Sequence, residues 1–147
     1  MARNHHERER QPQVIQTASE FFREITGDRY TGLRAPAGEP VIIAVTASGE
    51  EMQASQLSRG TREQMYLSLR FGLVRELSQH MASLPVIIDD ALVNSDPSRA
   101  RVAAECLGKL VDTNQVLVFT CHPTLVQQFK EACPDAEIQK LEQVQGS

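Results

Sequence analysis

The chain has 147 residues, of which 41% are hydrophobic and 23% are charged, a composition typical of one compact domain rather than of a disordered chain. Its 15 basic and 19 acidic side chains give a net charge of −4, so it lacks the basic excess with which a protein binds nucleic acid through charge alone. The three cysteines lack Cys-x-x-Cys spacing, which argues against a disulfide framework or a zinc site and favours a cytoplasmic protein. No apolar run is long enough to span a bilayer, so we expect no membrane contact.

The N-terminal part predicts a tail followed by a helix. Residues 1–12 alternate acidic and basic side chains, which is typical of a flexible tail. From Val14 to Ile25, apolar residues recur at three- and four-residue steps, which predicts a helix that Gly27 ends. We therefore divide the chain into a tail (1–12), a first helix (13–26) and a main unit (27–147).

Two strands and two turns are predicted next. Tyr30 to Leu33 and Val41 to Ala47 indicate a hairpin or meander, because the segment between them, Ala35-Pro36-Ala37-Gly38-Glu39-Pro40, is rich in turn formers. After a polar turn at Ser48 to Glu51 comes the segment Leu57-Ser58-Arg59-Gly60. A polar Ser/Gly turn that opens a helix can bind a phosphate group.

A long helix leads from this turn to an apolar strand. The helix is predicted from Thr61 to about Met81, with a buried stripe at a strict four-residue step that comprises Met65, Leu69, Leu73, Leu77 and Met81. The strand Val86–Ile88 follows and ends in Asp89 and Asp90. Two carboxylates at the end of an apolar strand are how phosphate-handling α/β proteins hold a magnesium ion and polarise a water molecule.

A second helix–strand unit completes the pattern. A helix is predicted from Pro97 to about Asp112, with an inward face that comprises Val102, Cys106, Leu107 and Leu110. The apolar strand Val116–Phe119 follows it. Apolar strands separated by helices predict a parallel sheet that is covered on both faces, with ligands at the carboxyl ends of the strands. Asp89, Asp90 and His122 all fall at that edge.

The order of these motifs resembles the C-terminal lobe of an ABC-type ATPase head. The likeness rests on Leu57-Ser58-Arg59-Gly60, Val86-Ile87-Ile88-Asp89-Asp90, Asn94-Ser95-Asp96 and Val116-Leu117-Val118-Phe119-Thr120-Cys121-His122. The likeness is closest to the SMC-like and RecF/RecN-like branch, and the sequence from Leu57 to Leu67 resembles the YhaN type of bacterial SMC-like ATPase.

The resemblance covers about Phe21 to Gln139, and it implies an α/β fold with a mostly parallel sheet and flanking helices. Residues 13–26 would form the root of a coiled coil. Residues 27–147 would form the lobe that carries the signature motif, Walker B, D-loop and H-loop. A Walker A loop, Gly-x-x-x-x-Gly-Lys-Ser/Thr, occurs nowhere in the sequence.

Roles at the strand ends follow from the resemblance. Asp89 would hold Mg²⁺, and His122 matches the switch histidine that contacts the γ-phosphate of ATP. Asp90 stands where the family's general base, usually Glu, orients the attacking water. Because Asp is one methylene shorter than Glu, either the water stands closer or hydrolysis is slow.

The remaining motifs imply contacts across a dimer. Ser58 and the Gly60 amide would bind the γ-phosphate of ATP held by the opposite protomer, aided by the positive potential of the helix N-terminus. Arg59 stands where most ABC signatures have Gly, and its contact with phosphate or ribose is left open. Asp96 matches the aspartate of the loop that crosses the dimer interface.

The function implied is half of an ATP-hydrolysing head that dimerises on ATP to drive a DNA-repair or DNA-processing complex, and the isolated chain is expected to be inactive. The implied partners are the N-terminal Walker A lobe of the same polypeptide, a second copy in an ATP-dependent homodimer, a metal-dependent nuclease and, through the complex, DNA.

Two alternatives stay open. One is a self-contained metal-dependent phosphohydrolase that uses Asp89, Asp90, Asp96 and His122, and the other is a non-catalytic interaction module. Taken singly, each motif also has an ordinary structural interpretation, as a helix N-cap for Ser58 and Asp96 or as a hydrogen-bonded loop residue for His122. Cys121 is expected to be a small buried residue rather than a nucleophile.

Overall fold

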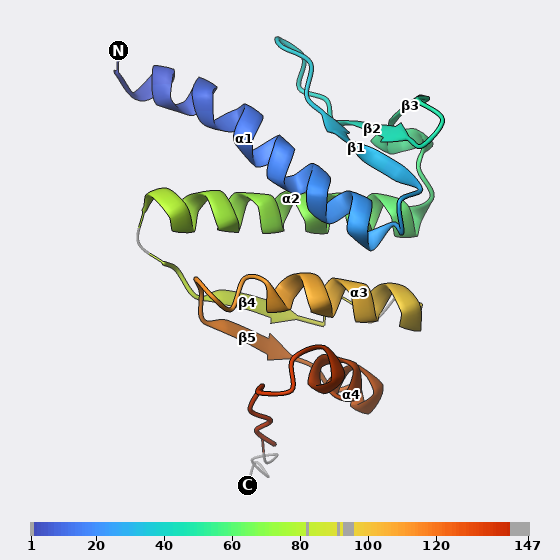
Figure 1. Cartoon of the computed structure of the whole chain (residues 1–147), viewed down its shortest axis with the longest axis vertical. Coiled ribbons are helices and arrows are strands. Elements are labelled where there is room, and N and C mark those ends of the chain that lie inside the picture. The colour runs from blue at the N-terminus through green and yellow to red at the C-terminus, as the bar shows by residue number, and fades with distance from the viewer. Residues whose placement is uncertain (1, 82, 91, 93–95, 142–147) are drawn as a thin grey trace, which may run out of the picture.

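The computed structural model describes the backbone of residues 2–81, 83–90, 92 and 96–141, and the side chains of these residues from residue 13 onward. The elements follow in the order α1 (Ala2–Ile25), β1 (Tyr30–Arg34), β2 (Ile43–Thr46), β3 (Glu51–Gln53), a 3-10 turn η1 (Ala54–Gln56), α2 (Arg59–His80), β4 (Val86–Asp89), α3 (Pro97–Gly108), β5 (Val116–Phe119) and α4 (Pro123–Ala132). In Figure 1, α1 crosses α2, the strands β1–β3 lie at one end of this helix pair, and β4, β5, α3 and α4 lie below it. Among the described residues, no helix is both long and apolar enough to cross a membrane.

Helix α1 begins at Ala2 instead of near Val14, so the backbone of residues 2–12 is helical where the sequence predicts a flexible tail. The segment is rich in Arg, Glu and Gln, which are good helix formers and extend a helix without needing an apolar face. The division into a coiled-coil root and a lobe stays a prediction.

The predicted end of α1 at Gly27 is confirmed. Gly27 adopts a positive φ of 62°, its N–H donates to the carbonyl of Glu24, and the N–H of Asp28 donates to the carbonyl of Arg23 at 2.9 Å. This pair of bonds satisfies carbonyls that the last helical turn would otherwise leave unpaired. The chain then reverses into β1, which packs beside α1 (Figure 1).

The predicted hairpin is confirmed as part of a three-stranded antiparallel meander, β1-β2-β3. The register pairs Leu33 with Ala44, and both are buried against Ala18 and Phe22 of α1. Strand β3 was not predicted, because Glu51-Met52-Gln53 is short and has a single apolar residue with no alternation to detect.

The buried face of α2 differs from the predicted stripe. Met65 is fully buried, but Leu73 is 47% exposed and Met81, just beyond the helix, is 62% exposed. A four-residue step overshoots one helical turn by about 40°, so a strict stripe rotates steadily away from the core. The residues that α2 buries are related by steps of three or four residues and comprise Thr61, Gln64, Met65, Leu67, Ser68, Phe71, Gly72 and Glu76.

Gly72 allows α1 and α2 to approach closely. A Cβ atom at this position would lie 2.8 Å from the backbone nitrogen of Ala18 and 2.8 Å from the carbonyl oxygen of Val14. Gly72→Ala is therefore expected to lower the free energy of unfolding by about 1–3 kcal/mol through overpacking, although Ala is the better helix former by about 1 kcal/mol. Urea unfolding measures this, with Leu73→Ala on the exposed neighbouring position as control. A midpoint for Gly72→Ala at or above that of the unmodified chain contradicts this packing.

Strands β4 and β5 are parallel, as predicted, and pair Ile87 with Leu117 and Asp89 with Phe119. The prediction that both faces of this sheet are covered is wrong for the described part of the chain. Ile88 and Val116 pack against the core, but Ile87, Leu117 and Phe119 on the other face are 64%, 39% and 45% exposed. We call these three residues the open sheet face.

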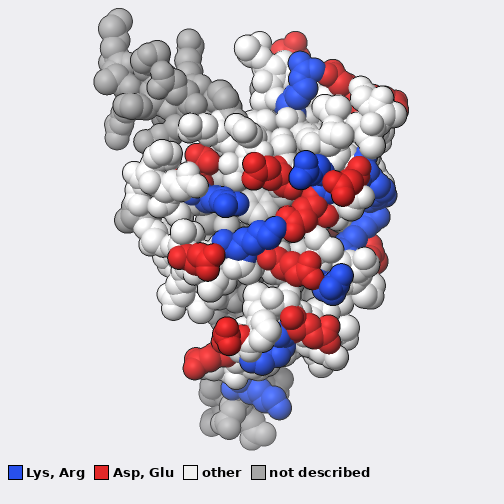
Figure 2. All heavy atoms as spheres, viewed as in Figure 1, with Lys and Arg blue, Asp and Glu red and all other residues white. Residues whose placement is uncertain are grey.

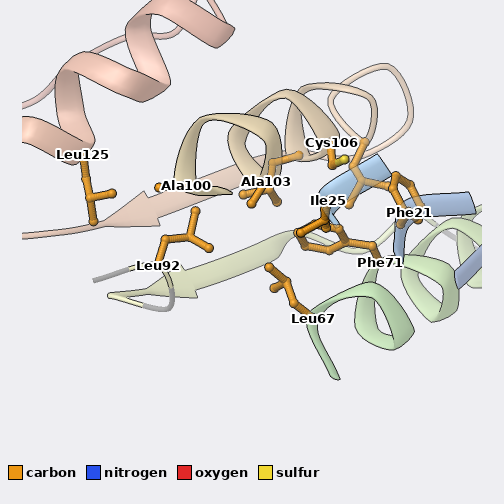
Figure 3. Close-up of a cluster of buried hydrophobic side chains, with 11 residues drawn as sticks. Phe21, Ile25, Leu67, Phe71, Leu92, Ala100, Ala103, Cys106 and Leu125 are labelled. Carbon is orange, nitrogen blue, oxygen red and sulfur yellow. The ribbon is translucent and has the colours of Figure 1, made fainter. Parts of the chain in front are cut away.

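The covered face of β4 and β5 packs on a core that α1, α2 and α3 share (Figure 3). Phe21 meets Phe71 edge to face, with ring centroids 5.5 Å apart. Helix α3 ends at Gly108, earlier than predicted, but Cys106, Leu107 and Leu110 are buried as expected. Helix α4 was not predicted, and it covers the core through Leu125.

Charged side chains on the face shown in Figure 2 are interleaved rather than gathered by sign. Ion pairs also join opposite charges within and between helices. Arg101 pairs with Glu105 on α3, and Lys109 pairs with Glu24 of α1. That face therefore shows no continuous basic surface of the kind that binds a nucleic-acid backbone.

Candidate functional site

The carboxyl ends of β4 and β5 bring three potential ligands together. Parallel pairing places both strand ends at one edge of the sheet, and the N–H of Asp90 donates to the carbonyl of Phe119 at 3.0 Å. One ligand atom each of Asp90, Cys121 and His122 lies within 4.8 Å of the other two. The sequence-based prediction that Asp90 and His122 share this edge is confirmed. We call the three residues the strand-end cluster.

Backbone turns explain how the strand-end cluster forms. Asp90 leaves β4 with a positive φ of 45°, a left-handed conformation that Asp and Asn adopt more readily than other side-chain-bearing residues. After β5, the N–H of His122 donates to the hydroxyl of Thr120 at 3.2 Å, and α4 begins at Pro123. His122 occupies the N-cap position, but its side chain makes no capping hydrogen bond. Its imidazole is therefore not used to cap the helix.

The expectation that Cys121 is buried is wrong. Cys121 is exposed, and its thiol donates to Oδ2 of Asp90 at a sulfur–oxygen distance of 3.9 Å. It lies two residues beyond the end of β5, outside the sheet. By contrast, burial and the nearby Glu24 carboxylate raise the pKa of the Cys106 thiol to about 12.

Asp89 lines a separate cavity of about 340 Å³ between the end of β4 and the helices α2 and α3. Gln64, Arg70, Arg99 and Leu92 line the same cavity. Gln64 is 5% exposed, and neither its carboxamide nitrogen nor its oxygen has a hydrogen-bond partner among the described residues. An unpaired buried polar group costs about 1–3 kcal/mol, so this carboxamide is suited to pair with a group that enters the cavity.

Ser58 is the N-cap of α2. Its hydroxyl accepts from the N–H of Thr61 at 3.2 Å and lies 2.9 Å from the Thr61 hydroxyl. Arg59 extends along the exposed side of α2 and pairs with Glu63, with 3.0 Å between Nε and the carboxylate. A Cβ atom at Gly60 would lie 3.0 Å from a guanidinium nitrogen of Arg99, so the Arg99 side chain of α3 reaches this turn.

Asp96 is the N-cap of α3. One carboxylate oxygen accepts from the N–H of Arg99 at 3.1 Å, and the other lies 2.8 Å from Nε of the same residue. Asn94 and Ser95, which belong to the same predicted motif, lie outside the described residues. Arg99 therefore connects the Asp96 cap, the Gly60 turn and the Asp89 cavity.

The predicted site residues thus fall into two groups. Asp90 and His122 form the strand-end cluster with Cys121, whereas Asp89, Gly60 and Asp96 are grouped around Arg99. No hydrogen bond joins Ser58 or Arg59 to the strand-end carboxylates within the described part of the chain.

Gln64, Arg99 and the exposure of Cys121 were not predicted from the sequence. Gln64 is a polar residue at a buried helix position, a signal that becomes visible only once the helical phase is correct. Arg99 follows Asp96 by three residues, the spacing at which helical side chains meet, and this was an available signal.

No protein-family model matches the chain. Over 119 residues it is 33% identical to YhaN, an uncharacterized protein of Bacillus subtilis (strain 168), and this match takes in 80% of the chain and 12% of that protein. The chain therefore spans about an eighth of the length of this relative.

Solved structures of SMC proteins have a similar fold. One of these structures comes from work on ATP-driven dimerization and DNA-stimulated activation of SMC ATPases. It matches with a TM-score of 0.65 and 16% identity, and the match covers 80% of this chain and 72% of the solved chain. The SMC head domain of Pyrococcus furiosus bound to the C-terminal domain of ScpA has a TM-score of 0.62 and 15% identity, with 80% and 30% covered. The SMC head domain of Thermotoga maritima has a TM-score of 0.58 and 18% identity, with 82% and 40% covered. The fold of this chain is therefore that of the C-terminal lobe of an SMC-type ATPase head.

Proposed function

We propose that this chain is half of an ATP-hydrolysing, SMC-like head, and that a lobe carrying the phosphate loop completes its nucleotide site. The observation that carries this proposal is the position of Asp89 and Asp90 at the end of a strand whose outer face is open. Two carboxylates at the end of a two-stranded sheet with one exposed apolar face fit a site that a second lobe completes.

The open sheet face gives the second lobe a surface to bind. Burying a Leu, Ile or Phe side chain that would otherwise face water contributes about 1.5–3 kcal/mol. Ile87, Leu117 and Phe119 are only partly buried, so covering them would stabilise the pair of lobes. The buried carboxamide of Gln64 offers a donor and an acceptor to the same partner at the neighbouring cavity.

The residues at the strand ends fit Mg²⁺ and ATP by their chemistry. Asp89 is an exposed carboxylate, the type of oxygen ligand that Mg²⁺ prefers. The ion would neutralise the charge that develops on the phosphate oxygens. Asp90 would orient the attacking water and accept its proton, and His122 would donate a hydrogen bond to the γ-phosphate.

The signature turn would act on the nucleotide of a second copy. Ser58 and the Gly60 amide lie at the N-terminus of α2, where a helix favours bound anions. Arg59 is exposed beside them and adds positive charge within reach of phosphate or ribose. With Asp96 at the same interface, two copies would enclose two ATP molecules in a two-fold symmetric dimer.

This ATP-dependent homodimer would drive a DNA-repair or DNA-processing machine. A solved SMC relative comes from work on ATP-driven dimerization and DNA-stimulated activation, and another is bound to a partner, the C-terminal domain of ScpA. For this chain we propose DNA as the substrate of the complex and a metal-dependent nuclease as its partner. Helix α1 would form the root of the coiled coil.

The alternative of a self-contained phosphohydrolase built on four residues finds less support. Of the four, only Asp90 and His122 share a cluster, whereas Asp96 caps α3 and pairs with Arg99. The alternative of a non-catalytic interaction module would be favoured if the full-length polypeptide also lacked a phosphate loop.

The isolated chain is expected neither to bind nor to hydrolyse ATP appreciably, because most of the amides and the lysine that hold the β- and γ-phosphates belong to the proposed second lobe. Titration calorimetry with Mg-ATP measures this. Adding the phosphate-loop lobe as a separate polypeptide should restore binding, and a sub-micromolar dissociation constant for the chain alone would overturn the half-site proposal.

A further inference from the structure

The strand-end cluster combines three kinds of metal ligand at one point of the surface. Its members are a carboxylate, a thiol and an imidazole, all exposed, from the ends of two paired strands. Residues 120–122 leave β5 in a turn closed by the Thr120 hydroxyl, so the neighbouring side chains of Cys121 and His122 both reach the side on which Asp90 lies. The spacing along the sequence argued against a zinc site, but the fold supplies the missing ligand from β4.

This ligand set differs from the one that magnesium prefers. Mg²⁺ takes hard oxygen ligands, whereas a thiolate with an imidazole selects thiophilic ions such as Zn²⁺. Zinc–ligand bonds are about 2.0–2.3 Å, so tetrahedral ligands lie roughly 3.5 Å from one another. The sulfur–oxygen distance is already 3.9 Å and the other pairs lie within 4.8 Å. Exposed side chains can close such gaps by small rotations.

We propose that Asp90, Cys121 and His122 bind one Zn²⁺ ion, with water in the fourth position, and that this ion inhibits the ATPase. Binding displaces the thiol proton of Cys121 to solvent, since the thiolate is the ligand. The proposed inhibition rests on the proposed function. The ion would bind the Asp90 carboxylate, which is assigned to orient the attacking water, and the His122 imidazole, which is assigned to the γ-phosphate. The metal site itself rests only on the geometry.

Among the cysteines, Cys121 alone combines exposure with neighbouring ligands. Cys106 is buried in the core, and Cys133 is partly buried beside Gly108. Neither belongs to a group of three potential metal ligands within the described part of the chain. Cys133→Ser is therefore a matched control that removes a thiol without touching the cluster.

Titration of the chain with Co²⁺ alone tests the metal site, because a cobalt–thiolate bond gives a charge-transfer absorption that imidazole and carboxylate ligands do not produce. The band is expected in the unmodified chain and in Cys133→Ser, and is expected to be lost in Cys121→Ser. The histidines at positions 5 and 6 cannot generate it. Competition with Zn²⁺ then gives the affinity for Zn²⁺. Asp90→Asn should weaken this affinity about 100-fold, because loss of a direct ligand costs at least as much as the loss of a residue that only supports a ligand.

Absence of the band, its survival in Cys121→Ser, or an unchanged affinity in Asp90→Asn overturns the metal site. Circular dichroism of each variant verifies that these exposed positions leave the fold intact.

Activity of the complete polypeptide separates the metal site from the proposed function. Zn²⁺ should inhibit ATP turnover of the unmodified protein, and Cys121→Ser should need about 10- to 100-fold more Zn²⁺ for the same inhibition. Equal sensitivity of the two proteins overturns the inhibitory role. A cobalt band in a complete protein that has no ATPase activity would refute the proposed function but support the metal site. ATPase activity in a protein that shows no cobalt band would support the proposed function but refute the metal site.

Discussion

Asp90→Asn in the complete head is expected to lower ATP turnover by about 100-fold or more, because general-base catalysis contributes about 10²–10⁴ to such reactions and an amide cannot accept the proton. Binding of Mg-ATP should be retained, since Asp89 remains to hold the ion. The closed, nucleotide-bound dimer should therefore accumulate. Phosphate release measures turnover, nucleotide titration measures the binding of Mg-ATP, and sedimentation measures accumulation of the dimer.

The structure makes Asn the appropriate replacement at position 90. Asp90 has a positive φ of 45°, and Asn is one of the few residues that adopt this conformation with little strain. A loss of turnover would then report on the carboxylate rather than on a distorted backbone. Asp90→Ala lacks this advantage and would combine both effects.

Asp89→Asn is the matched comparison, because it makes the same chemical change one residue earlier. It should weaken Mg²⁺-dependent nucleotide binding itself, since the charge that attracts the ion is removed. Separate titrations with ATP and Mg-ATP measure this difference. Equal losses of nucleotide affinity in Asp89→Asn and Asp90→Asn would contradict the separate roles.

The fold of the second half was predictable because its signals are local. Val86–Ile88 and Val116–Phe119 are short apolar runs with polar ends, and the helix between them begins with an Asp-Pro pair that caps it. Once such strands pair in parallel, their carboxyl ends meet at one edge. The proximity of Asp90 and His122 follows from that rule without any knowledge of their contacts.

The surroundings of the site were not predictable, because they depend on rotational phase and on which surfaces lack a partner. The four-residue stripe placed Leu73 in the core, but the true phase turns Gln64 toward the Asp89 cavity and Leu73 outward. An apolar strand such as Val116–Phe119 is expected to be buried from its composition. Its exposed face becomes apparent only when the covering elements are traced in three dimensions.

Ser58→Arg is expected to abolish ATP-dependent dimerisation and hydrolysis while leaving ATP binding by the complete monomer nearly intact. The nucleotide of a monomer rests on its own phosphate loop, whereas a bulky cation at Ser58 would occupy the space of the partner's γ-phosphate. Nucleotide titration, sedimentation and phosphate release measure the three quantities on one protein.

The cap that Ser58 provides requires a control of its own. Its hydroxyl accepts from the N–H of Thr61, and loss of an N-cap costs about 1 kcal/mol of stability. Ser58→Asn retains a capping oxygen, and Ser58→Ala removes the cap without adding bulk or charge. If Ser58→Ala lost dimerisation as completely as Ser58→Arg, the defect would come from loss of the Ser58 hydroxyl, as helix cap or as phosphate contact, rather than from a blocked interface.

Mixing two inactive proteins tests whether the turn acts across the interface. A heterodimer of Ser58→Arg with a variant crippled in its phosphate loop contains one site with both lesions and one site in which an intact phosphate loop faces an intact Ser58 turn. That second site should hydrolyse ATP, so activity should return on mixing and should be highest near equal proportions. A turn that acts only on its own protomer's nucleotide gives no intact site in any mixture. Absence of recovery at every ratio, or turnover by Ser58→Arg alone at the unmodified rate, would therefore refute the role in trans.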